Sequence, residues 1–188
     1  MRCLIACEFS GVVRQAFRDR GHDAWSCDLL PAEDGSPFHY QQDVRVLLDG
    51  KHGEWDLMIA HPPCTHLAVS GARWFKDKRA EQADALDFVR YLMAASIPRI
   101  AIENPVSIIS TAIRKADGYY HPWQHGHGQV KKTGLWLKNL PMLVPSNIVE
   151  GRKAVVHRMP PGPDRWKERS RTLPGVAKAM ADQFGSFA

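Results

Sequence analysis

The sequence contains few cysteines and no closely spaced cysteine pair. Its 188 residues include four cysteines, none of them in a Cys-x-x-Cys motif. This spacing argues against a disulfide-rich secreted scaffold and a standard cysteine zinc module. Three of the four lie in strand-like runs, where cysteine behaves as a small hydrophobic residue. Only Cys64 falls in a loop, so its chemistry is the one that needs an explanation.

Long apolar runs are also missing. No run approaches the roughly 20 residues that a membrane span requires. The opening "MRCLIACEFSG" has an apolar part too short for a secretory signal, and Glu8 interrupts it. We therefore expect a cytoplasmic protein with no membrane partner. Its length is that of a single domain over residues 1–188.

Acidic residues are scarce in the last third of the chain. Residues 121–188 carry 11 basic and 4 acidic side chains, a net charge of +7. Residues 1–120 carry 14 basic and 16 acidic side chains, a net charge of −2. A basic surface attracts a polyanion such as nucleic acid, although a modest excess of positive charge also serves solubility. We expect DNA, double- or single-stranded, to be the partner.

Short β-rich runs alternate with helical segments through the first two thirds of the chain. This alternation predicts an α/β fold with a doubly wound, mostly parallel sheet. The pattern weakens after residue 105, where residues 121–145 predict a hairpin and residues 158–175 an irregular basic segment. The predicted strands are 2–7, 23–28, 55–60 and 99–103, and the predicted helices are 12–21, 79–96 and 176–185.

Polar groups follow the predicted strands directly. "EFSG", Asp28, "HPPC" and "ENP" each stand at the end of one strand. The carboxyl ends of parallel strands meet at one edge of a sheet, where α/β folds bind their ligands. We therefore expect these four groups to converge on one site.

The "FSG" turn after the first strand is a candidate cofactor site. Gly11 has no Cβ, which lets a ligand approach the backbone, and the helix that follows offers unpaired amides. Asp28 is placed to accept from ribose hydroxyls, and Asp43 from an adenine amino group. The Gly-x-Gly-x-x-Gly fingerprint is absent, so a tight turn and solvated acids are the alternative. Together the three positions favour an adenosine-containing cofactor.

Cys64 has three candidate roles: a nucleophile, a zinc ligand or a structural thiol. In "AHPPCTH" it lies between His61 and His66, and basic residues follow closely. Positive charge lowers the pKa of a thiol, which favours the nucleophile. The zinc spacing matches no standard module, so we expect no metal. Glu103 ends the neighbouring strand, where a buried carboxylate can hold a proton for a ring nitrogen, unless it only caps a helix.

The order of these motifs resembles that of the cytosine-5 DNA methyltransferases. The motifs are "FSG", Asp28, Asp43, "HPPC", "ENP", "QVKKT" and "TLPGVAKAMADQF", and they span about residues 3–184. The resemblance implies a class I, Rossmann-like methyltransferase fold with S-adenosyl-L-methionine as cofactor. It also implies that Cys64 attacks carbon 6 of a flipped-out cytosine while Glu103 engages ring nitrogen 3, so that carbon 5 takes the methyl group.

The resemblance also assigns the other site residues. Lys131 would take the place of a family arginine beside Cys64 and Glu103. Cofactor binding would fall to Phe9, Ser10, Gly11, Asp28, Leu29, Asp43, Val44, Pro62, Thr172 and Pro174, and substrate binding to Pro63, Asn104, Gln129, Lys132, Arg165 and Arg169.

The chain departs from the family at several positions. Thr65 follows the cysteine where the family has glutamine, and Pro105 follows Glu-Asn where it has valine. Lys131, with either Lys132 or Thr133, stands in place of its arginine pair, and lysine lacks the bidentate fork of arginine. There is no room for a full target recognition domain, and a basic segment at about residues 121–171 takes its place. In this compactness the chain resembles phage or prophage members of the family.

This reduced size leaves the substrate open. Sequence specificity is relaxed, supplied by residues 152–171, or delegated to a partner protein. Single-stranded DNA and a free nucleotide are alternative substrates.

Two other functions explain part of the sequence. Amino-methyltransferases acting on adenine or cytosine also have a strand-end Pro-Pro tetrapeptide, but with Asp or Asn first and an aromatic last, where this chain has His61 and Cys64. A catalytically silent nucleic-acid-binding module would need only the basic patch around Trp166. That module would leave the groups at the strand ends without a role.

Overall fold

The computed structural model describes residues 1–187, apart from the side chains of Trp74 and His157. Its strands form one mixed sheet in the order β3-β2-β1-β4-β5-β7-β6. The strands are β1 (Arg2–Ala6), β2 (Asp23–Asp28), β3 (His39–Gln41), β4 (Leu57–Ala60), β5 (Arg99–Pro105), β6 (Gly118–Tyr120) and β7 (Thr133–Lys138). β1 to β5 run parallel, and β7 is antiparallel to both of its neighbours. The predicted α/β fold with a mostly parallel sheet is confirmed.

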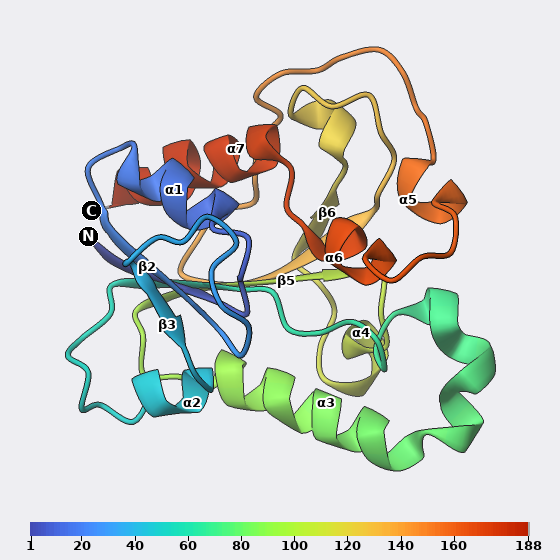
Figure 1. Cartoon of the computed structure of the whole chain (residues 1–188), viewed down its shortest axis with the longest axis horizontal. Coiled ribbons are helices and arrows are strands. Elements are labelled where there is room, and N and C mark those ends of the chain that lie inside the picture. The colour runs from blue at the N-terminus through green and yellow to red at the C-terminus, as the bar shows by residue number, and fades with distance from the viewer. Residues whose placement is uncertain (188) are drawn as a thin grey trace.

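Helices cover both faces of this sheet (Figure 1). The α-helices are α1 (Val12–Arg18), α2 (Val44–Leu47), α3 (Arg79–Met93), α4 (Ile109–Ala112), α5 (Val155–Arg158), α6 (Arg165–Ser170) and α7 (Pro174–Phe184), and 3-10 helices span Val69–Asp77, Pro122–Gln124 and Gly185–Phe187. α1 and α7 lie together on one face, while α2, α3 and α4 lie on the other. No helix in the described part of the chain is long and apolar enough to cross a membrane.

Two apolar cores separate these layers from the sheet. Side chains of a strand alternate between its two faces. Along β1, Ile5 packs in one core with Phe17 of α1 and Phe184 of α7. Leu4 packs in the other core with Leu92 of α3. All five side chains are fully buried, so both faces of β1 are covered, as a central parallel strand requires.

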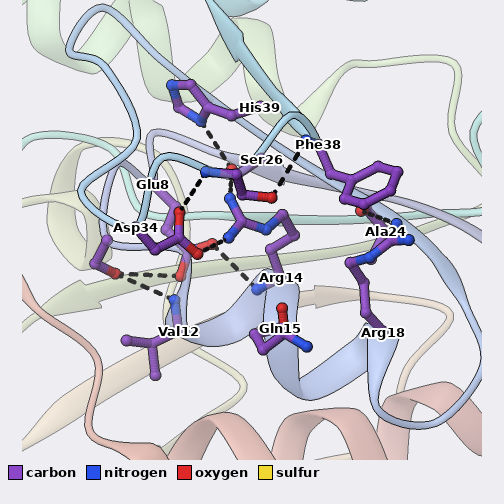
Figure 2. A network of polar contacts seen from close by, with 12 residues as sticks. Glu8, Val12, Arg14, Gln15, Arg18, Ala24, Ser26, Asp34, Phe38 and His39 are labelled. Atoms are coloured by element: carbon purple, nitrogen blue, oxygen red, sulfur yellow. Dashed lines mark hydrogen bonds and ion pairs between the residues drawn. The ribbon is translucent and has the colours of Figure 1, made fainter.

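A buried arginine ties α1 to the loop after β2 (Figure 2). Arg14 is fully buried, and its guanidinium pairs with Asp34 and donates to Ser26 Oγ at 3.0 Å. Ser26 Oγ is also 2.8 Å from His39 Nδ1, which extends the network to β3. Gly11 lies against the same guanidinium with a φ of 73°, so a side chain there would be both strained and in collision with Arg14.

Several boundaries predicted from sequence needed correction. The strand expected over 2–7 ends at Ala6, so Cys7 lies outside it, and the helix expected over 79–96 ends at Met93. The helix expected over 12–21 ends at Arg18, and the turn closes at Gly21 with a φ of 79°. A hairpin was expected within residues 121–145. Its strand β7 lies there, but β7 pairs with β6, which precedes that segment. The segment expected to be irregular holds α6, a helix of six residues. Short elements of three to six residues carry too little periodicity to be found in a sequence.

The Arg14 network predicts a stability difference between two matched substitutions. Asp34→Asn should lower the free energy of unfolding by about 1–3 kcal/mol, because it leaves a buried guanidinium with a neutral partner. Asp87→Asn is the control, since Asp87 pairs with Arg90 on the exposed surface of α3 and should cost less than about 1 kcal/mol. Urea unfolding measures both. Equal losses would contradict a special role for the buried charge.

Candidate active site

A cavity of about 80 Å³, open to solvent, lies at the carboxyl ends of three strands. Residues 7–10 follow β1, residues 61–64 follow β4, and residues 103–105 end β5. Lys131 and residues 169–172 complete the wall. Three of the four groups expected to converge therefore share one cavity. The fourth, Asp28, does not line it.

Cys64 lies in this cavity on a loop that β5 holds in place. Asn104 Nδ2 donates to the carbonyl oxygen of Pro62 at 2.9 Å. The amides of Leu67 and Ala68 donate to the carbonyl oxygen of Cys64 at 3.0 and 2.9 Å, which closes a turn behind it. The thiol is thus held at a fixed place beside the end of β5.

The charges around Cys64 differ from those expected. Burial raises the pKa of the thiol, while Lys131 and Arg169 act to lower it. The two positive charges come from distant parts of the chain, and His61 contacts Glu103 instead. The expected lowering of the thiol pKa was therefore wrong: burial leaves the pKa of Cys64 raised, and the charges that oppose this rise are those of Lys131 and Arg169.

Glu103 is a buried carboxylate held by several donors. His61 Nδ1 lies 2.8 Å from Glu103 Oε2, and both side chains are at least nine-tenths buried. Burial alone would raise the pKa of Glu103, but the hydrogen bond and charge of His61, with Lys131 and Tyr120, leave that pKa lowered. Glu103 is therefore a carboxylate in the resting protein.

Glu8 is a second buried carboxylate in the cavity, and sequence reasoning missed it. Its two oxygens accept the amides of Val13 at 2.6 Å and Arg14 at 3.1 Å. Figure 2 shows Glu8 beside Arg14. Burial raises the pKa of Glu8, although His61 and these bonds oppose the rise. The amides of α1 that were expected to be unpaired are thus occupied. An acid directly after a buried strand, in "EFSG", was the available signal.

The C-terminal part of the chain covers the cavity as a strap, which we define as residues 165–172. α6 lies near the end of β5 in Figure 1. Lys131 Nζ donates to the carbonyl oxygen of Arg169 at 3.0 Å, and Arg171 Nη2 donates to both oxygens of Glu33 at 2.9 and 2.7 Å. The rings of Phe9 and Trp166 are 5.8 Å apart. These contacts fix the strap over the site.

Ten of the residues predicted to form the site line this cavity. They are Phe9, Ser10, Pro62, Pro63, Cys64, Glu103, Asn104, Lys131, Arg169 and Thr172. Nine others do not line it: Gly11, Asp28, Leu29, Asp43, Val44, Gln129, Lys132, Arg165 and Pro174.

The acidic residues among those nine still lie beside the cavity. Cys7 lines it, and the charges of both Asp28 and Asp43 act on its thiol. Asp28 accepts the Leu30 amide at 3.0 Å, and Asp43 caps α2 by accepting the Arg45 amide at 2.9 Å. These two carboxylates can therefore extend the site past the end of β1.

The remaining residues have other surroundings. Leu29 is 71% exposed and Val44 is buried in the core. Lys132 Nζ lies 4.5 Å from the centre of the Tyr119 ring, and Arg165 Nε donates to the carbonyl oxygen of Met159 at 3.0 Å. Gln129 pairs through its backbone with Lys153, and Pro174 begins α7.

A metal site is not indicated by this geometry. Within residues 1–187, no three histidine, cysteine or acidic side chains are grouped so that they could hold a metal ion.

The four thiols should differ in reactivity. Cys3 and Cys27 are fully buried, and burial raises the pKa of each to about 12. We expect iodoacetamide to modify Cys64 before either of them, at a rate that rises with pH because only the thiolate reacts. Mass spectrometry of peptides identifies each site.

The same assay tests the charge beside Cys64. Lys131→Met should slow Cys64 alkylation roughly three- to tenfold, because it removes a charge that lowers the thiol pKa. Lys138→Met is the control, because Lys138 donates to the Ala95 carbonyl oxygen and lies at the far end of β7. Equal rates in the two variants would contradict the role of Lys131.

Comparison with known proteins supports the fold. No protein-family model and no curated protein matches the chain. Among solved structures, it is similar to a protein of E. coli, encoded within a prophage and provisionally named a DNA modification methyltransferase. The TM-score is 0.53 at 15% identity, over 79% of this chain and 51% of that one. The chain thus spans about half the length of that structure, and the two share a fold over the matched part.

Proposed function

We propose that the protein is a class I methyltransferase that transfers a methyl group from S-adenosyl-L-methionine to carbon 5 of cytosine in DNA. One observation carries the proposal: Cys64, Glu103 and Lys131 line the same cavity. A thiol, a carboxylate and a cation are the groups that covalent catalysis on a cytosine ring requires. The similarity of fold to the E. coli prophage protein supports the methyltransferase class.

In this proposal Cys64 forms a covalent bond with carbon 6 of the base. The burial that raises the thiol pKa also removes water from the thiolate once it forms. Lys131 and Arg169 supply the positive charge that favours the thiolate. Glu103 faces ring nitrogen 3, where negative charge develops as the bond to Cys64 forms.

The cofactor supplies an electrophilic methyl group when it is bound. It has no phosphate, so the amides of α1 that Glu8 occupies are not needed to hold it. Its sulfonium and amino groups are positive, and Glu8, whose raised pKa a bound cation would lower, lines the cavity. Phe9 and Ser10 would line its pocket, while Asp28 and Asp43 beyond Cys7 would accept from its ribose and adenine.

In this proposal the strap is the part of the protein that contacts the DNA. Arg169 lines the cavity, and Trp166 is 52% exposed beside it. An exposed aromatic ring among basic residues suits stacking on a base that has left the duplex. The strap is short, so we propose that it supplies little sequence specificity and that a partner protein is a further source of it.

Methyl transfer is tested on DNA with labelled S-adenosyl-L-methionine and nucleoside mass spectrometry. We expect 5-methylcytosine from the wild type and a loss of at least about 1,000-fold in Cys64→Ala, because the nucleophile is removed.

Cys27→Ala is the control, because Cys27 is buried in β2 and outside the cavity. N6-methyladenine or N4-methylcytosine that persists in Cys64→Ala would contradict the proposal in favour of an amino-methyltransferase. Salt-dependent DNA binding with no methylated base would favour a silent binding module.

A further inference from the structure

His61 stands between two buried carboxylates of the cavity. Its backbone amide donates to the carbonyl oxygen of Ala6 at 2.9 Å, which fixes the residue between β1 and β4. Its Nδ1 lies 2.8 Å from Glu103 Oε2 at the end of β5. The charge of His61 also acts on Glu8, at the end of β1.

The other ring nitrogen of His61, Nε2, makes no hydrogen bond within the described part of the chain. This nitrogen is also buried. Leaving a buried ring nitrogen without a partner is costly, so its place at the cavity wall points to function.

We propose that His61 is the positioning residue that holds Glu103 in place and supplies the proton that Glu103 passes to ring nitrogen 3 of the base. The inference rests on the proposed function and adds to it a source for the proton. Glu103 alone is an unsuitable donor, because its resting form is the carboxylate. Neutral cytosine presents nitrogen 3 as an acceptor, so a proton has to reach it through Glu103.

The step balances in protons and electrons. Cys64 first releases its thiol proton to solvent. The thiolate forms a bond to carbon 6, the π electrons shift toward nitrogen 3, and nitrogen 3 takes a proton from Glu103. Glu103 takes the Nδ1 proton of the His61 imidazolium, which becomes neutral. After carbon 5 has been methylated, its proton leaves to solvent, and the Cys64 bond breaks with its electron pair returning to sulfur. Nitrogen 3 then returns its proton to Glu103 and His61.

Several charged and titratable groups surround the His61–Glu103 pair. Glu103 contacts His61 from the end of β5, and Glu8, at the end of β1, interacts with the charge of His61. Lys131 and Tyr120 act on Glu103, and Arg14 of α1 acts on Glu8.

The first test needs no methyl transfer. The carboxyl pKa of Glu103 is measured by carbon NMR on glutamate-labelled protein, with Glu103→Gln to assign the signal. His61→Phe and His61→Asn should both raise this pKa, because both remove the charge of His61, and phenylalanine also removes the hydrogen bond. An unchanged Glu103 titration in both variants would overturn the inference.

The second test uses the pH profile of kcat. His61→Asn keeps an N–H donor but cannot release a proton, so kcat should fall roughly 10- to 100-fold with little change in KM for DNA. The dependence of wild-type kcat on pH that arises from proton transfer by His61 should be absent in this variant.

His66→Asn is the matched control, because His66 lies in the same loop but does not line the cavity. It should retain the wild-type rate and profile. Equal behaviour of the two asparagine variants would overturn the role of His61. A wild type that methylates no base would contradict the proposed function, and the Glu103 titration would then still decide whether His61 controls Glu103.

Discussion

The hydrogen bond between His61 and Glu103 joins the two strands on which the candidate active site is built. β4 and β5 are adjacent and parallel, so the residues after them emerge side by side. A carboxylate at that position loses most of its hydration, and it is tolerated only when it is paired. His61 supplies that pairing, and Asn104 holds the following Pro-Pro-Cys turn against β5. The position of Cys64 follows from these two contacts.

Acidic and basic groups interact throughout the buried part of the site. Glu8 and Glu103 are the acidic groups, and interactions with Arg14, His61 and Lys131 act to lower their pKa values. Interactions between buried charges are stronger than those at the surface, because little water screens them. The same arrangement therefore stabilises the fold around β1 and sets the protonation of the groups that carry out the proposed chemistry.

Much of the fold could be predicted from the sequence, because the buried strands and the long helix α3 have clear apolar patterns. The groups directly after β1, β4 and β5 were predicted to meet for the same reason. What could not be predicted are contacts between distant residues: the pairing of His61 with Glu103, the capping of α1 by Glu8, and the approach of Arg169 to Cys64. Because His61 is close to Cys64 in the sequence, it was expected to act on that thiol. In the structure β4 and β5 are adjacent, and His61 pairs with Glu103 instead.

The position of the strap also depends on contacts between distant residues, which the sequence does not reveal. Its basic composition was evident, but its place over the cavity depends on the ion pair of Arg171 with Glu33, residues 138 positions apart. Such long-range contacts give the last third of the chain its role in the site.

Covalent capture of the base tests the central claim most directly. DNA containing 5-fluorocytosine is incubated with the protein and S-adenosyl-L-methionine, and the product is analysed by intact mass and peptide mapping. Fluorine at carbon 5 cannot leave as a proton does, so the account predicts a stable adduct between Cys64 and the methylated base. Methylation of an exocyclic nitrogen with no adduct at Cys64 would contradict it.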